Sequence, residues 1–186
     1  SAGVKILSEM ILEGGRPLLG CVRIQGSKNA ALPVMAASVL VPGVTVLSNC
    51  PEISDVSCMC ELLRSVGAKV VREGRKLVID ASRISRCHLP EEYVTRMRSS
   101  VILAGAMLGR CREVYFQHPG GCVIGDRPID MHLDALRQLG AVFTQDGDHL
   151  AGRAGRLSGA RIILKFPSVG ATENAVLAAV LAEGTT

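Results

Sequence analysis

Two similar heptapeptides give the strongest indication of how the chain folds. Residues 62–68 read LLRSVGA, and residues 135–141 read ALRQLGA. In both copies the apolar residues have helical spacing and a glycine follows them, as is common at the end of an amphipathic helix. Gly67 and Gly140 are 73 residues apart, and this period is too long for a solenoid repeat. The sequence therefore predicts an α/β domain built from duplicated units.

Around the first copy, apolar periodicity and turn residues predict a complete α/β unit. Pro33 is acceptable in the first turn of a helix, and Ser54 and Asp55 suit the cap and the first turn of another. Strand-like runs also precede the unit, near 10–13 and 18–25. The predicted elements of the first unit are a helix over 29–41, a strand over 43–47, a helix from Ser54 to Gly67, and strands over 69–72 and 76–80.

Around the second copy the same order recurs. The predicted elements are a helix over 93–108, a strand over 113–116, a helix that ends at Gly140, and strands near 141–144 and 149–151. A third unit begins at 174–179, which echoes 29–32, and the chain stops where its first strand should start. We therefore expect a truncated third unit, part of a longer protein, and an open sheet edge that could support self-association.

Composition excludes several classes of protein. Apolar residues make up 48% and charged residues 20% of 186 residues, which is typical of a soluble globular protein. Aromatic residues are only 3%, and the net charge of +4 is scattered, so we expect no nucleic-acid partner. The longest apolar-rich stretch, 30–47, contains two prolines and a glycine, so we expect no membrane span.

The seven cysteines point to a reducing compartment. Their number is odd and they form no Cys-x-x-Cys pair, so a disulfide framework and a structural zinc site are not expected. Reduced cysteines are typical of a cytosolic protein, and the sequence suggests neither a metal nor a cofactor.

Two cations stand at matching points of the repeat. Gly26, Ser27, Lys28 and Asn29 follow a predicted strand and open a helix, whose free N–H groups suit a phosphate or a carboxylate. Arg98 lies 70 residues after Lys28, so the two cations could converge on one anion. Solvated side chains at two helix starts are the alternative.

The third predicted helix has a small-residue start. Ser168 or Thr172 could cap this helix, with Glu173 in its first turn. The glycine between them would let the backbone approach a ligand. A plain helix cap is the alternative.

The most specific motif is GGCVIGDRP at 120–128. Two glycines before Cys122 give the backbone freedom, and a nearby cation lowers the pKa of a thiol. Arg127 would act in that direction, whereas Asp126 would act against it. The residues alone leave open a reactive cysteine and a buried core thiol.

Taken together, four segments resemble the enolpyruvyl transferase family, and in particular the members that act on UDP-N-acetylglucosamine. They are GSKNAALP at 26–33, TRMRSS at 95–100, PGGCVIGDRPIDMHLDAL at 119–136 and SVGATENAVLAA at 168–179. The resemblance implies transfer of the enolpyruvyl group of phosphoenolpyruvate to the sugar 3-hydroxyl, with release of phosphate, at the start of peptidoglycan synthesis. It also implies an inside-out α/β barrel domain.

The resemblance assigns roles to individual residues. Lys28 and Asn29 match positions that hold phosphoenolpyruvate, and Cys122 matches a general acid that can form an adduct with it. The positions that match the UDP-N-acetylglucosamine site are Arg98, Arg127, Pro128, Ile129, Asp130, Met131, Ser168, Val169 and Gly170. The sequence departs from the family pattern at Asp126 and at Phe166–Pro167.

The resemblance also predicts the domain organisation. Residues 1–25 would supply strands to a second, absent domain, and residues 26–186 would form part of the first. The general base would lie in the missing C-terminal half, so we expect this chain alone to be inactive. Two alternatives stay open: an enolpyruvyl transferase of the shikimate pathway, and a non-catalytic module that binds sugar nucleotides.

Overall fold

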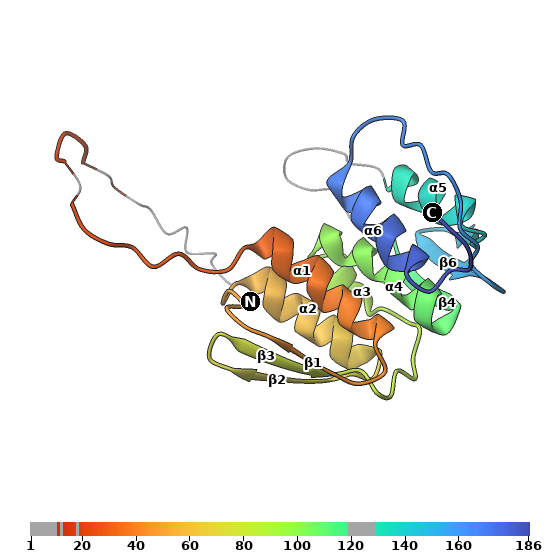
Figure 1. The fold of residues 1–186 in the computed structure, drawn as a ribbon, viewed down its shortest axis with the longest axis horizontal. Helices are drawn as coiled ribbons and strands as arrows, with labels where there is room; N and C mark the ends of the chain where they lie inside the picture. The colour runs from red at the N-terminus through yellow and green to blue at the C-terminus, as the bar shows by residue number, and fades with distance from the viewer. Residues whose placement is uncertain (1–10, 12, 18, 119–128) are drawn as a thin grey trace, which may run out of the picture.

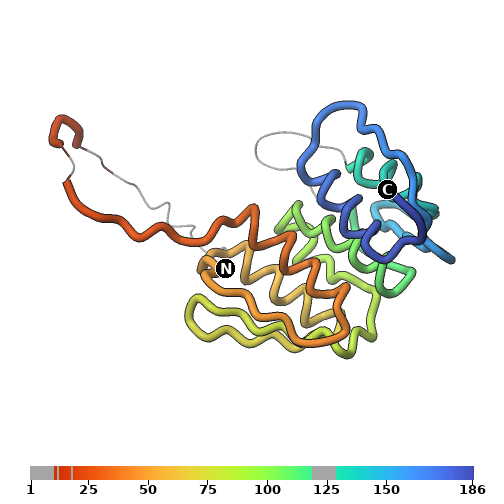
Figure 2. Tube along the Cα trace, in the orientation of Figure 1, coloured from red at the N-terminus to blue at the C-terminus, as the bar shows by residue number. Residues whose placement is uncertain are grey.

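Two similar units follow one another along the chain. The structure is a computed structural model that describes residues 11, 13–17, 19–118 and 129–186. In Figure 2 the first unit runs from orange to yellow-green, and the second continues from green to light blue on the other side of the molecule. This arrangement confirms the repeated α/β units that the sequence predicts.

The first unit places two helices over one small sheet (Figure 1). Its elements are α1 (Lys28–Ala37), the 3-10 turn η1 (Ser38–Leu40), β1 (Val44–Leu47), α2 (Ser54–Ser65), β2 (Lys69–Glu73) and β3 (Lys76–Asp80). Helix α1 packs on α2, and α2 packs on β2.

The second unit repeats this order after a short connection. The elements from there on are α3 (Glu91–Val94), the 3-10 turn η2 (Arg98–Val101), α4 (Ile102–Cys111), β4 (Glu113–Gln117), α5 (Asp130–Gln138), β5 (Val142–Asp146), β6 (His149–Arg153) and α6 (Val169–Ala179). Helix α6 follows the second unit and packs on both α4 and α5.

The two sheets share one topology. Their strand orders are β1-β3-β2 and β4-β6-β5, so the last strand of each unit is central, and all pairs are antiparallel. Strands β2 and β3 form a short hairpin with Val71 opposite Val78, and β5 and β6 form another with Thr144 opposite Ala151.

The duplicated heptapeptide forms the same helix end in both units. Gly67 and Gly140 adopt left-handed backbone angles, with φ of 109° and 98°. The amide of the next residue then bonds back into the last turn, from Ala68 N to Leu63 O at 3.0 Å and from Ala141 N to Leu136 O at 3.1 Å. This is the Schellman arrangement, which glycine adopts without strain.

A single hydrophobic core joins the units, and α4 lies at its centre. Every residue of α4 from Ile102 to Gly109 is buried. Helix α4 contacts α1 on one side and α6 on the other. The buried glycines and alanines of α4 allow this close packing of helices.

Two local predictions are wrong. The helix expected over 93–108 is broken, because Met97 is extended and buries its side chain while the Thr95 hydroxyl donates to Glu91 O at 2.8 Å. Ser54 does not cap α2: Ile53 precedes the helix, and Ser54 is its first residue. Residues 19–25 pair with no strand of the described chain and extend away from the domain (Figure 1), so the strand expected over 18–25 stays a prediction.

The described residues can also be compared with the requirements of a membrane span, a metal site and a disulfide. None of the helices in this part of the chain has the length and apolar character needed to span a bilayer. No group of three metal-binding side chains occurs within the same residues. The six cysteines they include are all free thiols.

Candidate functional site

A cavity of about 500 Å³ opens where three helices meet. The start of α4, the start of α5 and the start of α6 each contribute one wall. Its lining residues are Arg98, Ser99, Val101, Ile102, Met131, His132, Phe166, Ser168, Val169, Gly170 and Glu173. The structure therefore brings together residues from three of the four segments that the sequence analysis singled out.

The α6 wall is a helix N-terminus. Ser168 caps α6, as expected, since its hydroxyl accepts from Ala171 N at 3.3 Å. Thr172 is not the cap, and its hydroxyl donates back to Ser168 O at 2.8 Å. Glu173 lies in the second turn instead of the first, because α6 begins at Val169, and burial raises the pKa of its carboxyl. The free N–H groups of this first turn favour an anion.

Arg98 supplies positive charge at the α4 wall. It is half-buried at the start of η2, next to the buried helix α4. Its charge reaches across the cavity, because it helps to lower the pKa of His132 on α5. A guanidinium with this placement suits a phosphate or carboxylate ligand.

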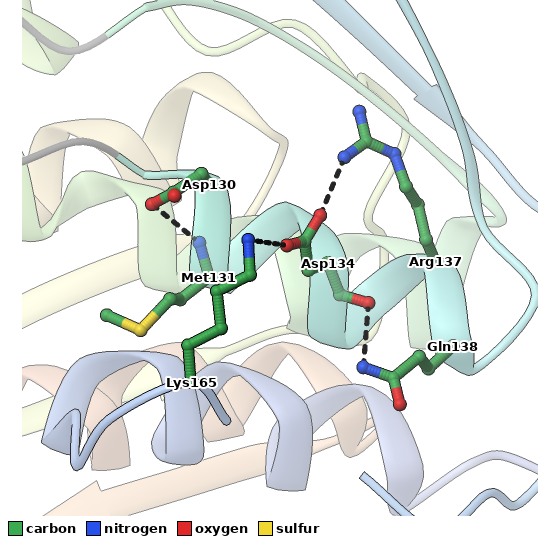
Figure 3. A network of polar contacts seen from close by, with 6 residues as sticks. All are labelled: Asp130, Met131, Asp134, Arg137, Gln138 and Lys165. Atoms are coloured by element: carbon green, nitrogen blue, oxygen red, sulfur yellow. Dashed lines mark hydrogen bonds and ion pairs between the residues drawn. The ribbon is translucent and has the colours of Figure 1, made fainter. Parts of the chain in front are cut away.

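The α5 wall is held by a polar network (Figure 3). The Asp130 carboxylate accepts from Met131 N at 2.9 Å, which supports the first turn of α5. Asp134 pairs with Arg137 at 3.1 Å on the same helix and with Lys165 at 3.5 Å. Because Lys165 belongs to the segment that leads into α6, this exposed ion pair shows that the segment lies beside α5.

Two polar residues that the sequence did not mark as functional belong to this site: His132 lines the cavity, and Asn174 is buried behind it. His132 is 5% exposed, and burial together with the Arg98 charge lowers its pKa to about 4. Asn174 is fully buried: Nδ2 lies 3.0 Å from Val101 O and 3.2 Å from His132 Nδ1, and Oδ1 accepts from Gly105 N at 2.7 Å. The signal in the sequence was an asparagine among the alanines and valines of a predicted helix.

The predicted site residues divide into four groups, of which the last is Lys28 and Asn29. Arg98, Met131 and Ser168–Gly170 line the cavity. Ile129 is buried at the start of α5 and Asp130 is exposed, and neither lines the cavity. Cys122, Arg127 and Pro128 lie outside the described residues.

Lys28 and Asn29 lie elsewhere. Both are exposed in the first turn of α1, and Lys28 Nζ is 3.4 Å from Asp55 Oδ1 of α2. Neither residue lines the cavity that contains Arg98. The expected convergence of Lys28 and Arg98 on one anion is therefore not seen in the described part of the chain.

Comparisons with known proteins identify the same fold. The family described as EPSP synthase (3-phosphoshikimate 1-carboxyvinyltransferase) matches residues 12–186. Among solved structures, the enolpyruvyl transferase NikO from Streptomyces tendae aligns with a TM-score of 0.78 at 24% identity, over 92% of this chain and 40% of that chain. EPSP synthase from Acinetobacter baumannii aligns with a TM-score of 0.69 at 18% identity, over 89% of this chain and 39% of that one. These alignments confirm the predicted enolpyruvyl transferase fold.

The curated relatives carry a more specific name. UDP-N-acetylglucosamine 1-carboxyvinyltransferase 2 of Caldanaerobacter subterraneus subsp. tengcongensis is 43% identical over 175 residues, which are 94% of this chain and 42% of that protein. UDP-N-acetylglucosamine 1-carboxyvinyltransferase of Desulfatibacillum aliphaticivorans is 44% identical over 97% of this chain and 43% of that protein. The chain thus spans about two fifths of the length of these relatives.

Proposed function

The chain belongs to the EPSP synthase family, and on this premise we propose that it is part of an enzyme that transfers the enolpyruvyl group of phosphoenolpyruvate to the 3-hydroxyl of UDP-N-acetylglucosamine. Phosphate is released, and the product enters peptidoglycan synthesis. The names of the relatives at 43% and 44% identity support this choice of acceptor over shikimate 3-phosphate. The observation that carries the proposal is the cavity that gathers Arg98, Met131 and the start of α6.

The chemistry of the cavity suits a sugar nucleotide. A diphosphate needs cations and N–H donors, and Arg98 and the first turn of α6 offer both. A sugar or a base ring needs apolar contact as well, which Val101, Ile102 and Phe166 can provide. We therefore assign UDP-N-acetylglucosamine to this cavity, with Arg127–Met131 as the segment that completes the site.

The remaining roles follow from the reaction. The methylene carbon of phosphoenolpyruvate must gain a proton while the sugar hydroxyl gives its proton to the general base and its oxygen bonds to the neighbouring carbon. The methyl group formed in this way then loses a proton, and phosphate leaves as the double bond forms again. We assign the proton donor to Cys122, which can also hold a covalent adduct, and the binding of phosphoenolpyruvate to Lys28 and Asn29. Lys28 is exposed and its ion pair with Asp55 is long, so it can turn toward a stronger anion.

The domain assignment is part of the proposal. Residues 26–186 form one portion of a catalytic domain, and residues 1–25 supply strands to a further domain that carries the general base. The exposed apolar side chains of Val22 and Ile24, 86% and 79% accessible, support this, since they alternate as in a strand that awaits a partner. We place the enzyme in the cytoplasm, and the unpaired sheet edges allow self-association.

Binding to this chain tests the choice of substrate. UDP-N-acetylglucosamine and shikimate 3-phosphate are titrated separately into the chain, followed by calorimetry. We expect heat from the sugar nucleotide only, and loss of that heat in Arg98→Ala. Binding of shikimate 3-phosphate alone would move the protein to the other branch of the family.

Phosphate release tests the reaction. Phosphate is measured from phosphoenolpyruvate with and without UDP-N-acetylglucosamine, both for this chain and for the longer protein that contains it. We expect release only from the longer protein, only with the sugar nucleotide, and not after Cys122→Ser. Binding without any release from the longer protein would instead support a non-catalytic sugar-nucleotide module.

A further inference from the structure

Behind the cavity, the side-chain amide of Asn174 is held in one orientation. Its Oδ1 accepts from Gly105 N at 2.7 Å, and its Nδ2 donates to Val101 O at 3.0 Å. Both partners are backbone groups with fixed roles, since an N–H only donates and a C=O only accepts. A reversed amide would oppose donor to donor and acceptor to acceptor, so the structure permits one orientation.

This orientation determines which nitrogen of His132 carries the proton. The second hydrogen of Asn174 Nδ2 is directed to His132 Nδ1, 3.2 Å away. His132 Nδ1 must therefore accept, and a neutral imidazole that accepts at Nδ1 is protonated at Nε2. Burial and the nearby Arg98 hold the pKa of His132 at about 4, so the ring is neutral at neutral pH.

The protonated edge of the ring faces the cavity wall. A Cβ added at Gly170 would lie 3.2 Å from His132 Cε1 and 3.5 Å from Nε2. Gly170 and His132 both line the cavity, so the Nε2 edge is turned toward the start of α6. A side chain at position 170 would pack against this edge of the ring, and glycine leaves the edge without that contact.

We propose that Asn174 is a positioning residue that fixes His132 as the Nε2–H tautomer and thereby gives the cavity a neutral hydrogen-bond donor beside Arg98. The ligand group that fits is an oxygen acceptor of the sugar nucleotide, a phosphate or a carbonyl oxygen. The identity of this ligand rests on the proposed function, whereas the assignment of the tautomer does not. A neutral donor adds a directed hydrogen bond without a second positive charge next to Arg98.

The competing explanation is that Asn174 is only a structural link between α4 and α6. Its contacts with Val101 and Gly105 would suffice for that role. The two explanations differ in the protonation of His132, because a structural link has no effect on which ring nitrogen carries the proton. A spectroscopic readout of the ring therefore separates them.

The test is nitrogen NMR of the 186-residue chain with labelled histidine, in which the couplings between ring protons and nitrogens report the tautomer. The His132 signals are assigned by their absence from His132→Gln. We expect the Nε2–H form in the wild-type chain. In Asn174→Asp the carboxylate can only accept, so we expect the proton to move to Nδ1. Ser38→Ala is the matched control, because it removes a buried side-chain hydrogen bond elsewhere in the core, from the Ser38 hydroxyl to Met35 O. We expect it to leave the tautomer of His132 unchanged.

The second arm adds UDP-N-acetylglucosamine. We expect the His132 Nε2–H resonance to shift on binding, and His132→Phe to weaken binding about tenfold, which is typical for loss of one hydrogen bond. His132→Gln can place a donor near the original Nε2, so we expect it to stay within about threefold of wild type.

The outcomes are distinguishable. A wild-type proton on Nδ1 overturns the assignment to Asn174 by itself, even if Asn174→Asp does not fold. A sugar nucleotide that binds without moving the Nε2–H signal overturns the donor role. A chain that binds no sugar nucleotide but holds the Nε2–H tautomer counts against the proposed function, and the positioning role of Asn174 then stands.

Discussion

The two units have the same plan, but among the described residues the second lines the cavity and the first does not. Helices α2 and α5 end in the same motif, and each carries an ion pair three residues apart, Glu61 with Arg64 and Asp134 with Arg137. The position in α5 that corresponds to Met59 in α2, 73 residues on, is His132, and both side chains are buried. An apolar core residue of one unit is thus a polar wall residue in the other.

The difference arises from α6. In the first unit α1 packs directly on α2, whereas in the second α5 packs on α6, which also packs on α4. Asn174 of α6 then supplies polar partners to both neighbours. The repeated unit is therefore a scaffold, and a neighbouring helix with one buried asparagine converts its surface into a candidate site.

The largest effect is expected where α4 and α6 touch. A side chain at Gly105 would collide with the backbone oxygen and Oδ1 of Asn174, so Gly105→Ala should lower the free energy of unfolding by about 4 kcal/mol. Urea denaturation measures this loss. Gly109→Ala on the same helix is the control, since its nearest neighbour is the flexible end of Leu40 at 3.2 Å, and it should change stability by less than about 1 kcal/mol. Equal losses in both variants would refute the close-contact explanation.

The next largest effect that we expect is a loss of stability at acidic pH. The pKa of His132 is lowered from 6.5 to about 4, so as pH falls through this range the unfolded chain takes up a proton that the folded chain does not. The free energy of unfolding is therefore unaffected by this group above pH 6.5, and we expect it to be about 3 kcal/mol lower at pH 4. Denaturation at a series of pH values measures the loss.

His132→Met gives the second unit the residue of the first and sharpens this test. A thioether does not titrate, so we expect the variant to lose less stability than wild type between pH 6.5 and pH 4. Identical pH profiles for the variant and the wild type would assign the acid sensitivity to other groups.

A smaller effect separates the two cations. Arg98→Ala should weaken UDP-N-acetylglucosamine binding about thirtyfold, because a hydrogen bond to a charged group contributes about 2 kcal/mol. Lys28→Ala should leave this affinity within about twofold, since Lys28 does not line the cavity. Calorimetric titration of both variants decides the point, and equal losses would mean that both cations serve one anion.

The smallest effect is the stability contribution of the Lys28–Asp55 pair. The side chains are 48% and 29% exposed and 3.4 Å apart, so Asp55→Asn should change the free energy of unfolding by less than about 0.5 kcal/mol. Thermal denaturation at low and high salt measures it. A loss of several kcal/mol would show that the first unit relies on this pair more than its exposure suggests.

The sequence predicted those features that depend on local periodicity. Gly67 and Gly140 end their helices as expected, because a left-handed residue is recognisable from neighbouring positions alone. The sequence also offered Ser168 and Thr172 as caps of one helix, and Ser168 is the cap. It missed the break at Met97, because the periodicity of α4 continues backward through 3-10 turn η2 and hides the extended residue.

The partners across the cavity could not be predicted in this way. Helical spacing shows which face of α6 is buried, but it does not reveal which helix lies opposite. Asn29 and Asn174 begin similar tetrapeptides, yet the first is exposed and the second has no exposed surface. Lys28 and Arg98 occupy matching positions, yet only Arg98 lines the cavity.

The bond between Gly105 and Asn174 has a consequence for synthesis of the protein. It joins residues 69 positions apart, so α4 leaves the ribosome roughly 3–14 seconds before its partner at about 5–20 residues per second. The strands of the first unit pair locally and can form during that interval. The cavity is therefore the last part of this region to assemble, and a nascent chain stopped after β6 would carry both sheets without a binding site.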